Sequence, residues 1–272
     1  MLNALVGEKL AIVSPKVQTT RHRIKAILTT DAYQVIFSDT PGIIDPQYKL
    51  HERMMQKVKN SLEDADVAVL LVDSKDNPEE ADGVFSQLRL RVVPAIVVLN
   101  KTDAVTPARL AELKAFFAAK PYTSDVLEVS ALKGTGVQEL LTALIARLPE
   151  GEPYFPGDDI TDLPTKFFVG EMVREKIYQM YAEEIPYHTA VLVQEFKEKT
   201  DIVKIRAEII VQRETQKGIL LGEGGKKIKE LGIAARKDIE AFLGTKVFLE
   251  LFVKVRPKWR DSDLLLKEYG YE

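Results

Sequence analysis

The first half of the chain alternates runs of apolar residues with segments in which apolar residues recur at helical spacing. Two of the apolar runs, residues 67–72 and 94–99, consist almost entirely of aliphatic side chains, and each ends abruptly in polar residues. Such runs are typical of strands that are buried on both faces of a parallel sheet. Helical spacing appears at residues 51–62, 108–119 and 137–148. This succession predicts a doubly wound α/β domain, whose ligands bind beyond the carboxyl ends of the strands.

Two shorter apolar runs, residues 24–28 and 33–37, are separated by four residues and predict a hairpin at the edge of this domain. Further on, residues 149–164 read PEGEPYFPGDDITDLP, which is too rich in proline for a long helix. We place a linker there, because exposed Pro- and Gly-rich segments commonly join domains. The predicted division is a first domain at 1–149, a linker at 150–164 and a second domain at 165–272.

The second half has a different order of elements, which predicts an α+β domain. A helix is expected at about 167–181, and two alternating strands at 189–196 and 202–212. A glycine-rich turn between two helices follows, and a last strand is expected at 246–255.

Composition narrows the class of protein. With 272 residues, of which 46% are hydrophobic, the chain can bury two ordinary cores. It contains no cysteine, which excludes disulfides and thiolate zinc sites, and it shows no secretory leader, so we expect a cytoplasmic protein. His22, His51 and His188 lack metal-ligand spacing, and we expect them on the surface or satisfied in the core.

The sequence Asn100-Lys101-Thr102-Asp103 comes directly after the apolar run 94–99. At the carboxyl end of a buried strand, the Asp103 carboxylate can accept hydrogen bonds from N1–H and the exocyclic amine of guanine, a pairing that adenine cannot offer. Asn100 and the stem of Lys101 would hold the loop and cover the base. The alternative is a solvated turn, but the position after a core strand favours guanine recognition.

Asp39-Thr40-Pro41-Gly42 also follows an apolar run. In phosphoryl-transfer sites an aspartate at such a position holds Mg²⁺, often through water, and a glycine lets its N–H approach a γ-phosphate. Taken alone, these residues fit an ordinary turn equally well. Their place upstream of the first motif, with strands and helices between, indicates a nucleotide site.

A third strand-end loop, SALKG at residues 130–134, follows the short run 126–129. Its backbone N–H groups could bind the guanine carbonyl at Ser130, Ala131 and Leu132, although a simple helix cap at Ser130 is the alternative. As the next strand-end loop in the chain, it falls where a second base-binding loop belongs.

Residues 15–23, PKVQTTRHR, precede the hairpin. In such a segment a threonine hydroxyl and carbonyl can meet Mg²⁺ and the γ-phosphate, which makes Thr19 and Thr20 candidates, with Thr20 and Asp39 as the metal ligands. A basic surface loop is the alternative.

The second domain contains a G-x-x-G sequence within residues 219–229, ILLGEGGKKIK. Glycines at this spacing let a turn between helices press its backbone against nucleic-acid phosphates, while the next helix contributes its N-terminal dipole and its lysines. The net charge of −3 argues against binding through bulk charge, so a local site is needed. The RNA contacts that we predict are Gly222, Glu223, Gly224, Gly225, Lys226, Lys227 and Lys229.

The order SPKVQTTRHR, DTPG, NKTD and SALKG, followed by the G-x-x-G of a KH domain, resembles the Era family over nearly the whole chain. The resemblance implies a ribosome-assembly GTPase that uses GTP, GDP and Mg²⁺ and binds the 3′ region of small-subunit ribosomal RNA in the ribosomal small subunit. It also implies a cytoplasmic monomer, with peripheral association at the inner face of the cell membrane in some members. The implied nucleotide contacts are Asp39, Thr40, Pro41, Gly42, Ile43, Asn100, Lys101, Thr102, Asp103, Ser130, Ala131 and Leu132.

The sequence departs from this pattern at its start. A phosphate-binding loop, G-x-x-x-x-G-K-[ST], belongs between a first strand and a helix, but residues 1–7 already look like that helix. We therefore expect a sheet that lacks a central strand, with the edges of its neighbours exposed, and phosphates without most of their ligands. A misplaced start site or a truncation explains this better than a natural loop-free protein. Guanine contacts should survive in this chain, while tight GTP binding and hydrolysis should be impaired.

Three further expectations concern mechanism. Ile43 stands where some GTPases have a glutamine that orients the attacking water, so hydrolysis of GTP should be slow.

The alternative function is nucleotide-independent RNA binding, with the first half of the chain as a scaffold. Trp259 and Arg260 either stack on a base or pack at an exposed edge.

Overall fold

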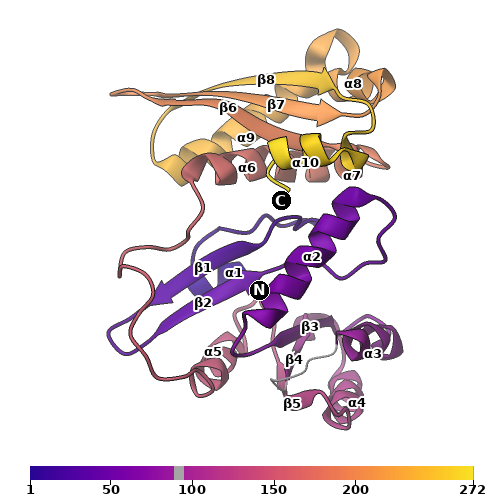
Figure 1. Cartoon of the computed structure of the whole chain (residues 1–272), viewed down its shortest axis with the longest axis vertical. Coiled ribbons are helices and arrows are strands. Elements are labelled where there is room, and N and C mark those ends of the chain that lie inside the picture. Colours follow the sequence, from indigo (N-terminus) through magenta and orange to yellow (C-terminus); the bar gives the residue numbers. More distant parts are fainter. Residues whose placement is uncertain (89–94, 272) are drawn as a thin grey trace. The chain divides into compact units, whose positions relative to one another are not determined.

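The computed structural model describes residues 1–88 and 95–271, which form two compact units (Figure 1). The first unit comprises Met1–Leu10, Ile24–Asp39 and Val58–Thr161. The second comprises Ala11–Arg23, Thr40–Lys57 and Asp162–Glu272. Two segments from the first half of the chain therefore belong with the second unit, a feature that the predicted division into consecutive domains does not include. That division stays a prediction.

A hairpin and a parallel sheet form the frame of the first unit. Strand β1 (Ile24–Thr29) pairs antiparallel with β2 (Gln34–Asp39), which confirms the predicted hairpin. Strands β3 (Val69–Asp73), β4 (Ala95–Asn100) and β5 (Thr123–Glu128) form a parallel sheet in the order β3-β4-β5. This confirms a strand in each of the two predicted runs, except at Pro94, which lies outside the described residues. Burial on both faces is confirmed for β4 but is wrong for β3, because Val69 and Leu71 on one face of that strand are 39% and 47% exposed. Among the residues described, the hairpin and this sheet are not hydrogen-bonded to each other.

Helices cover both faces of the β3-β4-β5 sheet. Val97, Leu99 and Phe117 belong to the core against α3 (Pro78–Gln87) and α4 (Pro107–Ala118), whereas Ile96 and Leu140 belong to the core on the opposite face. That second core includes α5 (Val137–Ile145) and side chains of α1 (Leu2–Val6). Each fully buried aliphatic side chain contributes about 1.5–3 kcal/mol, so the strand-end loops project from a rigid base.

The local sequence determines where α1 ends and where α3 begins. Helix α1 ends at Gly7, whose φ of 77° is left-handed, as the pattern of residues 1–7 indicates. Helix α3 was not predicted from apolar spacing. Its start is nevertheless encoded, since Asn77 accepts a hydrogen bond from the Glu79 N–H (3.0 Å) and Pro78 occupies the first helical position.

The segment after α5 has no helix or strand and is tied to the hairpin. The Ile160 carbonyl accepts from the Ile27 N–H (2.9 Å), and the Thr161 hydroxyl donates to the Lys25 carbonyl (2.7 Å). The linker thus begins as a strap along β1 rather than as a free tether.

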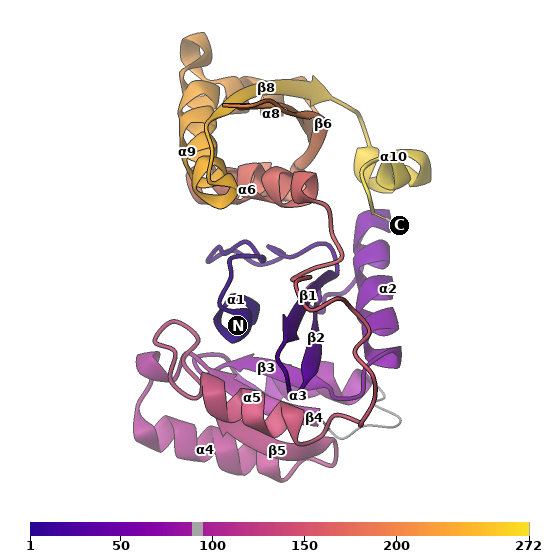
Figure 2. The ribbon, with the colours of Figure 1, turned by 90° about the vertical axis from the view of Figure 1, so that its left-hand side faces the viewer.

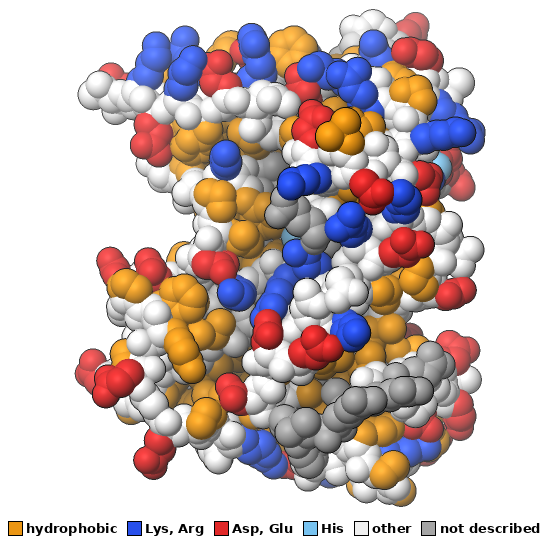
Figure 3. All heavy atoms as spheres, in the orientation of Figure 1, with side chains coloured by type: hydrophobic (Ala, Val, Ile, Leu, Met, Phe, Trp, Pro, Cys, Tyr) orange, Lys and Arg blue, Asp and Glu red, His pale blue; other side chains and the backbone are white. Residues whose placement is uncertain are grey.

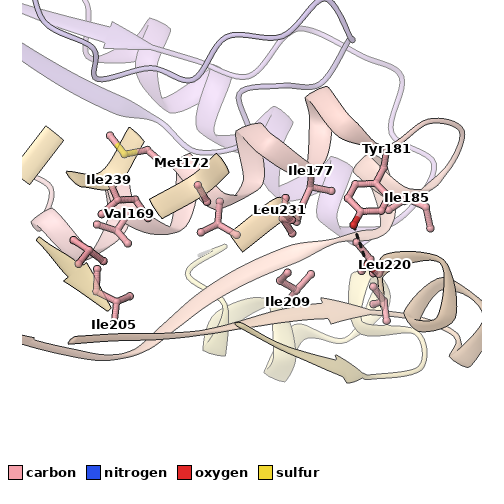
Figure 4. Close-up of a cluster of buried hydrophobic side chains, with 14 of the residues drawn as sticks. Val169, Met172, Ile177, Tyr181, Ile185, Ile205, Ile209, Leu220, Leu231 and Ile239 are labelled. Carbon is pink, nitrogen blue, oxygen red and sulfur yellow. Dashed lines mark hydrogen bonds between the residues drawn. The ribbon is translucent and has the colours of Figure 1, made fainter. Parts of the chain in front are cut away.

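The second unit places a three-stranded sheet over helices (Figure 2). Strand β7 is central, antiparallel to β6 and parallel to β8, and α6 and α9 cover one face. Figure 4 shows the resulting core, with residues such as Val169, Ile209 and Leu231. The elements are α6 (Thr165–Met180), α7 (Ile185–His188), β6 (Ala190–Glu198), β7 (Val203–Val211), α8 (Glu214–Leu221), α9 (Lys226–Leu243), β8 (Val247–Val255) and α10 (Asp263–Glu268).

Helix α2 (Lys49–Glu63) begins in the second unit, where Leu50 and Met54 share a core with Trp259. Trp259 is fully buried, and its indole N–H donates to the His188 carbonyl (3.1 Å). The suggestion that Trp259 stacks on a base is therefore wrong, because its ring has no free face. Arg260 lies over the ring of Tyr48, 4.0 Å from its centre. No helix in the described part of the chain is long and apolar enough to span a membrane.

Candidate nucleotide and RNA sites

The loop after β4 is held in an unusual backbone conformation. Asn100 ends the strand, Lys101 has a left-handed φ of 63°, and Thr102–Ala104 form one 3-10 turn. A side chain other than glycine rarely adopts this φ, and such strain is concentrated at functional sites. The conformation turns the chain sharply, so that Asn100 and Asp103 both come next to the loop that follows β5.

The loops after β4 and β5 are joined by two side-chain contacts. Asn100 Oδ1 accepts a hydrogen bond from the Ala131 N–H (3.1 Å), and the Ser130 hydroxyl donates to Asp103 Oδ1. The bond from Ser130 holds the pKa of Asp103 below its ordinary value, although partial desolvation opposes this. Asp103 is therefore an exposed, oriented carboxylate at the carboxyl edge of the sheet.

Two residues of this site were not predicted from sequence. Asp73, at the end of β3, pairs with the Lys101 ammonium group, and the Ser74 hydroxyl donates to the Asn100 carbonyl (2.7 Å). Burial tends to raise the pKa of Asp73, but the hydrogen bond from Lys101 outweighs it and the pKa is lowered. The same strand-end rule that located Asn100 would have found both, because they follow the apolar run 67–72 directly.

The turn after β5 leaves the Leu132 N–H available as a donor. The Ala131 N–H is bonded to Asn100, and the Lys133 N–H donates to the Ser130 hydroxyl (3.2 Å). Between them, the Leu132 N–H has no acceptor among the described residues, and the Leu132 side chain is 82% exposed. Gly136 closes the turn at a φ of 74°, where a Cβ would lie 2.1 Å from the Glu128 carbonyl oxygen, so only glycine fits.

The predicted phosphate-side residues are divided between the two units. Asp39 ends β2 in the first unit. Burial lowers the pKa of the Met1 amine, and the negative charge of Asp39 partly opposes this lowering. Thr40, Pro41, Gly42 and Ile43 belong to the second unit. A Cβ on Gly42 would meet nothing within 4 Å, so the surrounding protein does not crowd this backbone. The nucleotide contacts of these five residues stay a prediction.

Thr19 and Thr20 also lie in the second unit. The Thr19 hydroxyl donates to the Lys16 carbonyl (2.7 Å), and the Thr19 carbonyl accepts from Arg174 (2.5 Å). Within the described residues, no group of three or more His, Asp or Glu side chains could hold a metal ion. The assignment of Thr20 and Asp39 as ligands of Mg²⁺ stays a prediction.

The glycine-rich turn has the geometry that a phosphate-binding turn requires. Gly222, Gly224 and Gly225 have φ values of 68°, 58° and 77°, and α9 begins immediately afterwards at Lys226. A Cβ on Gly222 would lie 2.7 Å from Cγ of Lys227. The turn therefore needs glycine for its own backbone, and it exposes the N-terminus of an 18-residue helix.

The charges around this turn distinguish it from the sheet of the same unit. Figure 3 shows Lys and Arg side chains over the β6-β7-β8 sheet, interleaved with acidic ones. Several of these are paired, such as Lys254 with Glu208. By contrast, Lys226, Lys227 and Lys229 are exposed and form no ion pair with any residue that the structure describes. Lysine charge that the described residues leave unpaired thus lies beside the G-x-x-G turn.

Comparisons with known proteins match the two halves of the chain to different families. A family model described as "50S ribosome-binding GTPase" matches residues 1–101, and one described as "KH domain" matches residues 184–260. The chain is 43% identical over 274 residues to GTPase Era of Geotalea uraniireducens (strain Rf4), covering 100% of this chain and 92% of the relative. It is 42% identical, with the same coverage, to GTPase Era of Geobacter sp. (strain M21).

Solved structures give the same relatives. A crystal structure of Era in complex with MgGDPNP and nucleotides 1506–1542 of 16S ribosomal RNA matches with a TM-score of 0.94 and 39% identity, covering 99% of this chain and 93% of that one. A variant of Aquifex aeolicus Era bound to GDP·AlF4⁻ matches with a TM-score of 0.93 and 38% identity, at the same coverage.

Proposed function

Since the chain belongs to the Era family of GTPases, we propose that it is a guanine-nucleotide switch that binds the 3′ region of small-subunit ribosomal RNA and assists assembly of that subunit. The observation that carries the proposal is the pair of joined loops, in which Asn100 binds the Ala131 N–H and Ser130 orients Asp103. Guanine recognition requires an oriented, exposed carboxylate at this edge, and Asp103 supplies it.

The nucleotide site would work as follows. Asp103 accepts from N1–H and the exocyclic amine of guanine, and the free Leu132 N–H is a donor for the guanine carbonyl. Lys101, held by Asp73, covers the base with its aliphatic stem. Thr20 and Asp39 would hold Mg²⁺, which neutralises the phosphate charge.

The RNA site would be the turn Gly222–Gly225 with the lysines that follow it. Its glycines let the RNA backbone approach closely, and the N-terminus of α9 attracts phosphate oxygens. The KH match over residues 184–260 and the RNA fragment bound to the similar Era structure support this assignment.

RNA binding is tested with a double substitution of the turn. We expect Gly222→Asp with Gly225→Asp to weaken binding of an RNA that corresponds to nucleotides 1506–1542 at least about tenfold, because two carboxylates repel the phosphates and both positions have left-handed φ. Fluorescence anisotropy with labelled RNA measures the dissociation constant. The matched control is Gly83→Asp with Gly151→Asp, which adds the same charge where a Cβ has free space. Equal affinity of the turn variant and this control would show that the RNA interface lies elsewhere.

The alternative, an RNA-binding protein that does not respond to nucleotide, is favoured by one observation. Within the described residues, the hairpin and the β3-β4-β5 sheet are not paired with each other. The same anisotropy titration with millimolar Mg²⁺ and GTP, GDP or ATP separates the two functions. A shift in RNA affinity with GTP but not with ATP supports the switch, and no shift with any nucleotide supports the alternative.

Three finer statements rest on the family resemblance. We propose a cytoplasmic monomer that associates peripherally with the inner face of the cell membrane. Light scattering during gel filtration and flotation with anionic vesicles measure these properties directly.

A further inference from the structure

One face of the sheet in the second unit carries exposed aromatic rings. Along β8, Leu249, Leu251 and Val253 pack against the core that α6 and α9 cover, so the residues between them point to the opposite face of the sheet (Figure 2). Two of those residues are phenylalanines: Phe248 is 49% exposed and Phe252 is 44% exposed. The core therefore does not use these two rings. We call this side of the β6-β7-β8 sheet the outer face.

Each ring has a cation from the neighbouring strand beside it. In β7, Lys204 lies opposite Phe248, and its ammonium group is 6.0 Å from the centre of that ring. The guanidinium carbon of Arg206 lies 5.2 Å from the centre of the Phe252 ring. Proteins that bind single-stranded nucleic acid combine such groups, because aromatic rings stack on bases while cations attract the phosphates.

The charges on the outer face leave a small positive excess. Three carboxylates lie there, and each has a basic partner: Glu250 with Arg206 at 3.8 Å, Glu208 with Lys254, and Glu195 with Lys197 at 3.0 Å. Lys204 forms no ion pair with any residue that the structure describes. Since the three pairs cancel, Lys204 gives the face one positive charge in excess, which suits a phosphate backbone.

A hollow of about 290 Å³ adjoins Phe252 at one end of this face. Its charged lining residues are Arg206, Glu208, Lys254, Arg256 and Glu268. Three cations thus face two carboxylates, one of which is already paired with Lys254. A nucleotide whose base stacks on Phe252 has cations next to it for its phosphate.

The arrangement favours RNA over a protein partner. The centre of a protein interface is an apolar patch with few charged residues. Here Glu250 and Arg206 lie between the two rings instead. Separated rings suit bases, because each base stacks on one ring. A duplex hides the faces of its bases, so the ligand that fits this face is single-stranded.

We propose that Phe248 and Phe252 form a second binding surface for single-stranded RNA, separate from the G-x-x-G turn. The turn leads directly into α9, and α9 packs on the other face of the sheet (Figure 2). RNA therefore reaches the turn and the two rings from different sides of the sheet. Stacking tolerates any base, so this surface adds affinity with little sequence preference. The inference goes beyond the proposed function and does not require RNA to bind at the turn.

The test uses Phe252→Trp in the full chain as a reporter. The chain has one tryptophan, Trp259, which is buried, so a second indole on the outer face reports a stacked base separately. The probe is a single-stranded oligoadenylate of about 12 nucleotides, within the range that one binding module covers. We expect this RNA to quench the added tryptophan emission in a saturable way, and a duplex of the same length to leave it unchanged. The wild-type chain gives the signal of Trp259 alone.

Loss of the other ring should weaken this binding. In the reporter chain, Phe248→Leu should raise the Kd for oligoadenylate at least about fivefold, because leucine is still apolar but cannot stack on a base. The matched control is Tyr154→Leu, which removes an aromatic side chain that is 87% exposed in the first unit. Thermal unfolding shows that every variant is folded.

The outcomes separate the outer face from the turn. Quenching should persist when Gly222→Asp and Gly225→Asp are added to the reporter chain. If those substitutions abolish it, if Phe248→Leu binds as tightly as Tyr154→Leu, or if the single strand causes no quenching, the inference is refuted and the proposed function stands. If quenching persists while the turn substitutions leave binding of the 1506–1542 RNA unchanged, the proposed site at the turn fails and the outer face is supported.

Discussion

Replacing Asp103 with asparagine tests base recognition most directly. In the wild type, Ser130 donates to Oδ1 of Asp103, whose side chain lies at an exposed edge. The asparagine side chain of the variant can keep the bond from Ser130 through its carbonyl, which places its amide group where Oδ2 was. A donor then faces the exocyclic amine of guanine, which is also a donor, whereas xanthine presents a carbonyl there.

The magnitude follows from the bonds exchanged. A hydrogen bond to a charged group contributes about 1.5–3 kcal/mol, so losing one of them weakens guanine nucleotides by about 10- to 150-fold. Xanthosine triphosphate gains a neutral hydrogen bond and loses a repulsive contact with the carboxylate. The preference for GTP over xanthosine triphosphate should therefore fall by more than the loss in GTP affinity alone.

The assay is a fluorescence titration with labelled GTP and xanthosine triphosphate and Mg²⁺. The chain is compared with a version that carries a G-x-x-x-x-G-K-[ST] sequence joined ahead of Met1, so that affinities fall in a measurable range. Ser130→Ala is a useful companion, because it removes the donor that orients Asp103 while keeping the carboxylate. An unchanged preference between the two nucleotides in Asp103→Asn would refute the base-reading role of the joined loops.

Two further predictions concern stability. Gly136→Ala should destabilise the first unit by at least about 1 kcal/mol more than Gly134→Ala, because both glycines have a left-handed φ but only at Gly136 does a Cβ meet a carbonyl oxygen, and urea unfolding measures the difference. The pKa values of His22 and His188 are lowered to about 4, chiefly by burial, so the unfolded chain, with histidine pKa near 6.5, binds protons that the folded chain does not. Thermal stability should therefore fall as the pH falls from about 6.5 to about 4, and a flat melting temperature across that range would contradict these two pKa values.

Many of the helices and strands could be predicted from the sequence, because they depend on local patterns of apolar and polar residues. A strand buried on both faces must be apolar throughout, and β4 shows this from Ala95 to Leu99. Since parallel strands end at one edge of a sheet, the loops that follow β4 and β5 had to meet, and they do so through the bonds of Asn100 with Ala131 and of Asp103 with Ser130. The G-x-x-G spacing predicted a tight turn between helices, and Gly222, Gly224 and Gly225 form one at left-handed φ, which favours glycine.

The sequence could not show which surfaces the segments at 11–23 and 40–57 would bind. In the sequence, Arg21 looks like part of a basic loop. It is buried against carbonyls 165 to 168 residues away, and contacts at that separation produce no periodic pattern in the sequence. Trp259 likewise reads as a tail residue, yet it is enclosed by side chains from α2 and α10. Local propensity and the spacing of apolar residues determine helices, strands and the loops at strand ends. Contacts between segments that are far apart in the sequence are decided only when the whole chain packs, because many different contacts are compatible with the same composition.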